Sequence, residues 1–135
     1  MNAQRITGPF LSVFRIVIGL LFSFHGLGAI FGIMGRTEPV PFGEWPGWWA
    51  GLIEMVCGAL VLLGAATRPA AILASGAMAY AYFVVHQPQA LFPTQNGGVE
   101  AALYAWAFLA VAVLGAGPWS IDALWHRRSA EVVPA

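Results

Sequence analysis

Four long apolar runs, separated by short polar segments, dominate the hydrophobic pattern of this chain. A helix that crosses the hydrocarbon core of a bilayer needs about 20 mainly apolar residues. The runs approach this length and lie at about 10–34, 48–65, 70–87 and 99–117. They predict an all-α membrane protein, a single domain over residues 1–135 with four transmembrane helices.

The segments between the runs have the composition of loops. The first connection is polar and carries Pro39, Pro41 and Pro46. The second is a tight turn at 66–69, where Pro69 is suited to the first turn of the next helix. Connections this short favour an up-down-up-down bundle, in which each helix runs opposite to the one before it.

The arginines indicate how this bundle is oriented in the membrane. Only Arg36 falls on the side of the first connection, whereas the side of both termini and the middle turn carries Arg5, Arg68, Arg127 and Arg128. Positive residues are concentrated on the cytoplasmic side of membrane proteins. The sequence therefore predicts cytoplasmic termini and a multi-pass location in the cell inner (plasma) membrane.

Glu54 is the most unusual residue of the apolar runs. A carboxylate inside a span costs about 2.5–3.5 kcal/mol on insertion scales and marks a functional site by default. Arg15 and His25 interrupt the first run, and Glu100 stands at the head of the last. The alternative interpretation of Glu54 is a structural carboxylate, neutralised by burial or bonded to a neighbouring helix.

Depth along the predicted helices brings polar side chains from all four spans to one level, because each helical residue advances 1.5 Å. They form a predicted cluster in the outer half of the bundle, with members His25, Glu54, Tyr82, His86, Asn96, Glu100 and Tyr104. We predict catalytic, proton-handling roles for Glu54, Glu100 and His25. The predicted ligand-binding residues are His25, Tyr82, His86, Asn96 and Tyr104. In the alternative interpretation, the cluster only holds the helices together.

Arg15 lies toward the cytoplasmic end of the first helix, about 15 Å along the axis from His25. Two interpretations remain open. Arg15 either reaches the inner interface or pairs with Asp122, or it belongs to a charged column that leads to the outer cluster. Together with Arg68, Arg15 and Asp122 are the predicted structural charges.

Composition narrows the possible chemistry. Charged residues make up 9% of the chain and the formal net charge is zero, which argues against a nucleic-acid partner. Cys57 is the only cysteine, so disulfide exchange through a cysteine pair is excluded. No metal is predicted: the Glu-x-x-His pairs of di-iron bundles are missing, and no local pair spacing supports zinc held by His25, His86 and a Glu. Haem b held by His25 and His86 has only these two candidate ligands and is not favoured.

A quinone suits the predicted cluster better than a metal or haem. Its carbonyl groups take hydrogen bonds from His or Tyr, and a carboxylate can relay the protons that its reduction requires. The apolar and aromatic walls suit its ring and tail. A quinone is therefore the ligand that the residues favour, with membrane lipid as the surrounding partner.

Four sequence blocks, in this order, carry a family resemblance. They span 15–26, 51–71, 96–104 and 115–122, and read RIVIGLLFSFHG, GLIEMVCGALVLLGAATRPAA, NGGVEAALY and GAGPWSID. Together they resemble the DoxX family of small four-helix membrane proteins over nearly the whole chain. The family pattern usually has a lysine shortly after the His-Gly of the first helix, where this chain has Gly28-Ala29-Ile30.

The resemblance implies a redox-linked role in the membrane. The family is named through its relation to the DoxD subunit of a thiosulfate:quinone oxidoreductase, and some members resemble membrane anchors of oxidative-stress complexes with soluble partners. The family's motif positions are Arg15, His25, Glu54, Arg68, Asn96, Glu100 and Asp122 in this chain.

From residues and resemblance together, we expect a quinone-interacting or membrane-anchoring component of a sulfur, thiol or oxidative-stress redox system. Its expected partners are a soluble redox protein or further copies of itself. Two other classes stay open: a non-enzymatic structural or assembly subunit, and a carrier of a small solute or of protons.

Overall fold

The computed structural model describes residues 3–131 of the chain. The prediction that used Arg5 as a marker of orientation falls on a side chain outside the described residues. Every regular element within 3–131 is helical and no strand occurs there, which confirms the all-α prediction for this part of the chain.

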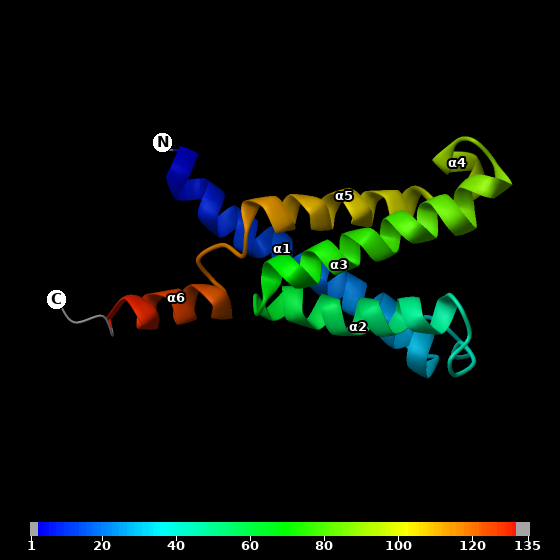
Figure 1. The fold of residues 1–135 in the computed structure, drawn as a ribbon, viewed down its shortest axis with the longest axis horizontal. Helices are drawn as coiled ribbons and strands as arrows, with labels where there is room; N and C mark the ends of the chain where they lie inside the picture. The colour runs from blue at the N-terminus through cyan, green and yellow to red at the C-terminus, as the bar shows by residue number, and fades with distance from the viewer. Residues whose placement is uncertain (1–2, 132–135) are drawn as a thin grey trace.

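Four long helices form the body of the described structure: α1 (Ala3–Phe31), α2 (Gly47–Leu63), α3 (Thr67–Tyr80) and α5 (Val99–Leu114) (Figure 1). The shorter elements are a π-helix η1 (Ala81–His86), a 3₁₀-helix η2 (Gln87–Gln89), α4 (Pro93–Asn96) and α6 (Ile121–Glu131). Since η1 continues α3 directly, the two act as one long rod.

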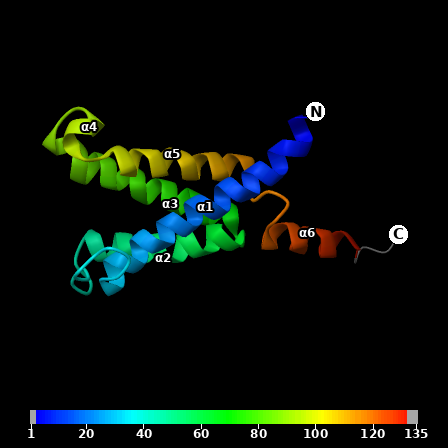
Figure 2. The same cartoon turned by 180° about the vertical axis from the view of Figure 1, so that it is seen from behind.

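The long helices lie along the long axis of the molecule and alternate in direction (Figure 1). Seen from behind, α1 crosses the other helices obliquely (Figure 2). The α1–α2 connection and α4 lie at one end, which we call the loop end. Both chain termini and α6 lie at the other, which we call the terminal end.

Backbone glycines set the ends of two helices earlier than the apolar runs predict. The first helix ends at Phe31 and not near residue 34, because Gly32 adopts a φ of +66°. Similarly, α5 ends at Leu114 and not near 117, because Gly115 has a φ of +93°. Apolar composition alone does not reveal these breaks, since Gly is common in transmembrane helices.

The segment beyond 117 also differs from the predicted polar tail. It folds into α6, an 11-residue helix with Asp122 in its first turn. A buried Ser120 precedes it, and the Ser120 hydroxyl accepts a hydrogen bond from the Ala123 N–H at 3.1 Å. Ser120 therefore satisfies one of the free N–H groups at the start of this helix.

Glycines allow α1 and α2 to pack at backbone contact. A Cβ atom on Gly58 would lie 2.6 Å from the Ser23 hydroxyl oxygen, and one on Gly19 would lie 2.6 Å from the Leu62 nitrogen. Small residues at such interfaces let helix backbones approach closely, as in many membrane helix pairs. Helix α1 packs chiefly on α2, while α3 packs chiefly on α5.

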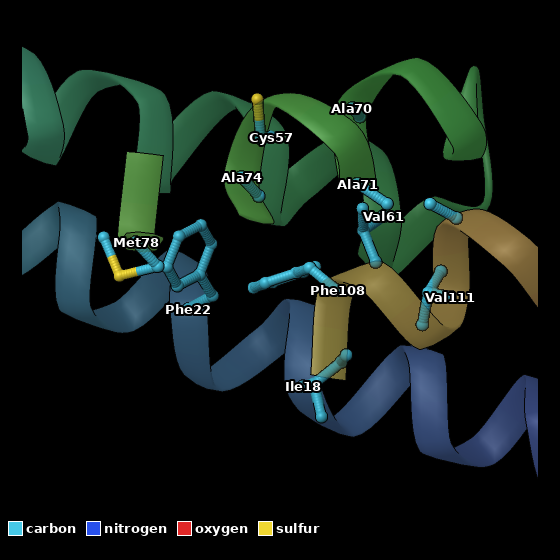
Figure 3. Close-up of a cluster of buried hydrophobic side chains, with 11 residues drawn as sticks. Ile18, Phe22, Cys57, Val61, Ala70, Ala71, Ala74, Met78, Phe108 and Val111 are labelled. Atoms are coloured by element: carbon cyan, nitrogen blue, oxygen red, sulfur yellow. The ribbon is translucent and has the colours of Figure 1, made fainter. Parts of the chain in front are cut away.

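The hydrophobic core lies at mid-length between these two helix pairs. Phe22 and Phe108, both fully buried, have ring centroids 4.5 Å apart at its centre. Val61 and Val111 are also fully buried nearby (Figure 3). This layer of packed apolar side chains separates the loop end of the bundle from the terminal end.

The outward faces of the helices are strongly apolar. Leu21, Ile72 and Trp106 have 51%, 61% and 73% of their surfaces exposed, and many other large apolar side chains accompany them. Two stretches are long and apolar enough to cross a membrane, Ile6–Phe31 and Thr67–Gln89, while α2 and α5 are shorter apolar helices. An apolar exterior this extensive is unusual for a soluble monomer and indicates contact with lipid or with other proteins.

Candidate functional site

His25 of α1 and Glu54 of α2 form a hydrogen-bonded pair near the loop end. The distance between His25 Nδ1 and Glu54 Oε2 is 2.8 Å, and this is the only ion-pair contact found in the described part of the chain. The Glu54 side chain is 5% exposed, whereas that of His25 is 46% exposed. The pair therefore links a buried carboxylate to a solvent-accessible imidazole.

The close approach of α1 and α2 explains why these two side chains meet. Gly51 and Gly58 lie three residues before and four residues after Glu54, which places all three on one face of α2. That face contacts α1, because Gly58 abuts Ser23 and Gly51 abuts Ala29. Glu54 thus points toward α1 at the level of His25.

His86 reaches the same region from the end of η1. Its Nδ1 lies 3.1 Å from the backbone carbonyl oxygen of Asn96. The Asn96 side chain is buried and holds the turn before α5, since its Oδ1 accepts from the Gly98 N–H and its Nδ2 donates to the Ala90 carbonyl. Asn96 therefore supports His86 through the backbone, and its own side chain does not line the cavity described next.

A cavity of about 270 Å³ at the loop end brings most of the predicted cluster together, and we call it the loop-end pocket. It is lined by His25, Arg36, Glu54, Met78, His86, Gly97, Glu100, Ala101 and Tyr104. Its volume lies just below the roughly 300–1,000 Å³ typical of sites for drug-sized ligands. The pocket therefore suits a ring-sized group, with any longer tail lying outside it.

Tyr82, which we predicted to bind the ligand, is not in this pocket. It lines a separate, mostly apolar groove of about 420 Å³ between α3 and α5, together with Ser75, Phe83 and Trp106 among others. Tyr82 and His86 nevertheless lie on one side of the helix, because a Cβ on Gly98 would meet Tyr82 Cδ2 at 2.7 Å and His86 Cβ at 2.9 Å. The two side chains therefore share a face, as their spacing predicts, but Tyr82 lines the groove and His86 lines the pocket.

Arg36 is the pocket residue that the sequence analysis did not identify. It belongs to the α1–α2 connection, and its Cδ and Cγ atoms lie 3.6 and 3.7 Å from the position that a Cβ on Gly28 would take. These are ordinary contact distances, and the tight neighbour of that position is the Ile33 carbonyl oxygen at 2.9 Å. Because Arg36 lies in a loop and follows no helical period, the sequence pattern does not place it in the pocket.

The inner wall of the pocket is aromatic. Tyr104 packs on Phe22 and Phe108, with ring centroids 5.1 and 5.9 Å apart respectively. Since Phe22 and Phe108 belong to the buried core, the pocket ends where the core begins. Its polar contents are confined to the loop end of the bundle.

Arg15 lies beyond that core, near the terminal end, and does not join the cluster. Its guanidinium donates to the carbonyl oxygens of Val61 and Leu62 at the end of α2, and to those of Ala116 and Trp119 before α6. Arg15 is 1% exposed, and no carboxylate lies within 4.0 Å of it among the described residues. It therefore caps helix carbonyls and has no direct ion pair with Asp122.

Asp122 has a separate structural contact at the terminal end. Its two carboxylate oxygens accept the N–H groups of Ala66 and Thr67, each at 2.9 Å, at the start of α3. Partial burial acts to raise the pKa of Asp122, but hydrogen bonds from Thr67 and Ala66 outweigh it, and the pKa lies below the ordinary carboxyl value. Arg68 lies close by, beside Gly115.

Neither the loop-end pocket nor any other part of residues 3–131 gathers three or more His, Cys, Asp or Glu side chains in an arrangement that can hold a metal ion. The pocket instead offers two imidazoles, two carboxylates, a guanidinium and a phenol beside an aromatic wall. These groups can exchange hydrogen bonds and protons with a small ring-shaped molecule.

Comparison with known proteins agrees with the resemblance of the four blocks. The DoxX family model matches residues 10–87. An uncharacterized protein of Haemophilus influenzae is 36% identical over 132 residues, which cover 94% of this chain and 98% of the relative. No solved structure shows significant similarity to the chain.

Proposed function

The chain belongs to the DoxX family, and from this premise we propose that it is a four-span membrane protein whose loop-end pocket binds a quinone as part of a redox system. The observation that carries the proposal is the buried Glu54 bonded to the accessible His25 in that pocket. An intramembrane carboxylate with a named partner is a functional site by default.

The proposed topology rests on the alternating helices and their apolar outer faces. Helices α2 and α5 have 17 and 16 residues, or about 25 Å at 1.5 Å per residue. A hydrophobic length slightly below the bilayer core of about 30 Å is accommodated by flanking residues or local thinning. The excess of arginine at the terminal end supports cytoplasmic termini and an outward-facing pocket in the inner membrane.

The donor set of the pocket fits a quinone head group. Tyr104 and Arg36 can donate hydrogen bonds to carbonyl oxygens, and Tyr104 adds an aromatic ring to the lining. A bound quinone supplies two-electron chemistry that takes up or releases two protons. Glu54 and His25 form a two-member chain for those protons, with the exposed Glu100 and His25 connecting the chain to water.

We further propose that electrons are exchanged with a soluble redox protein that the chain anchors at the membrane, or through an assembly of several copies. Sulfur, thiol or oxidative-stress chemistry is the setting that the family relation favours. A solute or proton carrier is less well supported, because the fully buried Phe22, Val61 and Phe108 lie between the pocket and the terminal end.

A structural role is the second candidate, and the His25–Glu54 bond itself favours it. The bond joins α1 to α2 at 2.8 Å and contributes to holding these helices together whether or not a ligand binds. In that case the chain is a non-enzymatic assembly subunit, and removal of the Glu54 charge affects stability alone.

The test is purification of the full chain in mild detergent, followed by solvent extraction of bound quinone and an absorbance spectrum. We expect quinone in the wild-type extract and at least a tenfold loss in Glu54→Gln. Glu44→Gln, in the exposed α1–α2 connection, is the matched control and should retain the wild-type content.

Three results would count against the proposal. A wild-type protein that neither carries quinone nor binds an added short-chain ubiquinone overturns it. Wild-type quinone content in Glu54→Gln with a lowered melting temperature favours the structural role. A Soret band in the spectrum identifies haem as the ligand in place of quinone.

A further inference from the structure

The hydrogen-bonding state of His86 follows from its partner. The Asn96 carbonyl oxygen, 3.1 Å from Nδ1, can only accept a hydrogen bond. Nδ1 must therefore carry the hydrogen. In the neutral imidazole this leaves Nε2 as a bare acceptor, and the ring lines the loop-end pocket.

The partner of His25, across the pocket, likewise determines which of its ring nitrogens carries the hydrogen. Its Nδ1 lies 2.8 Å from Glu54 Oε2, and an ionised carboxylate also accepts only. A carboxylate on one ring nitrogen sets the tautomer and makes the other nitrogen more basic. The remaining Nε2 of the neutral His25 ring is thus a second acceptor.

The pocket also holds two donors, Arg36 and Tyr104, which can donate to the oxygens of a quinone or of a quinol, because a hydroxyl oxygen accepts as well. Arg36 and Glu100 are both exposed, carry opposite charges and line the same cavity. Tyr104 lies against the aromatic core. The two imidazole rings, on α1 and at the end of η1, are therefore the lining groups that distinguish a quinone from a quinol, since each neutral ring offers an acceptor.

From this geometry we infer that, with both imidazoles neutral, the loop-end pocket prefers the reduced, hydroxyl-bearing quinol to the quinone. This inference rests on the proposed function. A quinone has carbonyl oxygens that only accept, so facing an imidazole acceptor leaves both groups unsatisfied. A quinol has two hydroxyl groups and can donate one to His25 and one to His86.

The expected size of the preference follows from the hydrogen bonds. Each neutral imidazole gains a hydrogen bond from the quinol that the quinone cannot make. We therefore expect the quinol to bind about ten- to a hundredfold more tightly than the quinone, or about 1.4–2.8 kcal/mol.

Three probes with the same ring test this preference. They are 2,3-dimethoxy-5-methyl-1,4-benzoquinone, its quinol, and the dimethyl ether of that quinol, which has no hydroxyl hydrogens. Their dissociation constants for the full chain in detergent are measured by calorimetry under argon, at a pH above that at which the imidazoles are protonated. The quinol should bind most tightly.

Matched histidine variants identify the groups responsible. His86→Gln should reduce the quinol-to-quinone affinity ratio about tenfold, because the glutamine amide can donate as well as accept. His126→Gln, in α6 outside the pocket, should leave the ratio unchanged. His25→Gln provides a second variant if His86→Gln does not fold, as judged by its melting temperature.

The outcomes separate this inference from the proposed function. Quinone binding as tight as or tighter than quinol binding overturns the preference while the proposed function stands. Equal binding of the dimethyl ether and the quinol also overturns it, since the hydroxyl hydrogens would then contribute nothing. Failure of all three probes to bind overturns the proposed function and the preference with it.

Discussion

Replacement of Arg15 tests how the terminal end of the bundle is held together. Its guanidinium bonds the carbonyl oxygens of four residues, two at the end of α2 and two before α6. The Arg15→Met variant keeps a long side chain but removes every donor and the charge. We expect it to lower the free energy of unfolding by about 3–5 kcal/mol, because four carbonyl oxygens lose a charged donor.

The hydrogen bonds of Arg15 set an upper limit to this loss of stability. A hydrogen bond that involves a charged group contributes about 1.5–3 kcal/mol, so four acceptors give roughly 6–12 kcal/mol. Burial of the guanidinium, which is 1% exposed, offsets several kcal/mol of that sum. Arg15→Lys should lie between the wild type and Arg15→Met, because an ammonium group lacks the planar fork that reaches both segments.

The assay is denaturation by SDS in mixed micelles, followed by far-UV circular dichroism. Arg127→Met in α6 is the control, since Arg127 is exposed and surface substitutions usually change stability by less than about 0.5 kcal/mol. If Arg15→Met lowers the free energy of unfolding by less than about 1 kcal/mol, the carbonyl groups find other hydrogen-bond partners and the capping role is refuted.

Three further predictions concern packing and pH. Gly58→Ala should destabilise the fold by more than about 2 kcal/mol through overpacking. A Cβ added at Gly76 meets nothing within 4 Å, so Gly76→Ala should be neutral or stabilising by up to about 1 kcal/mol. Thermal melts compare the two variants. Phe108→Ala removes a fully buried ring and should cost about 3–5 kcal/mol in SDS denaturation. The pKa of Asp122 is lowered in the folded state. Its contribution to the free energy of unfolding should therefore be present above about pH 4, and it should be lost as the pH falls through the folded-state pKa. Asp122→Asn should lower the free energy of unfolding by about 0.5–2 kcal/mol at pH 7, because asparagine caps the Thr67 N–H more weakly. The difference in stability between variant and wild type should close at low pH, and a difference independent of pH would contradict this prediction.

The sequence was informative about depth along the helices. Apolar runs locate helices because burial in lipid or core selects for them over many residues. Depth then placed His25 and Glu54 at one level, and in the structure their side-chain atoms lie 2.8 Å apart.

The sequence was less informative about which cavity a helical side chain lines and about where loop side chains lie. Regular helical spacing placed Tyr82 and His86 on one face, where both meet Gly98, but it did not show that Tyr82 lines the groove and His86 the pocket. Arg36 enters the pocket from a connection that has no period to extrapolate. Arg15 bonds main-chain carbonyls, which every residue has, so charge pairing alone could not identify its partners.

The contacts of Arg15 also bear on how the chain is made. Ala116 and Trp119 follow Arg15 by 101 and 104 residues, so these acceptors are synthesised long after the first helix. Until then the guanidinium can reach only the carbonyl groups of α2, and part of its bonding capacity stays unused. A chain that stops after α5 would therefore keep an incompletely bonded guanidinium, and full bonding of Arg15 requires the segment that leads into α6.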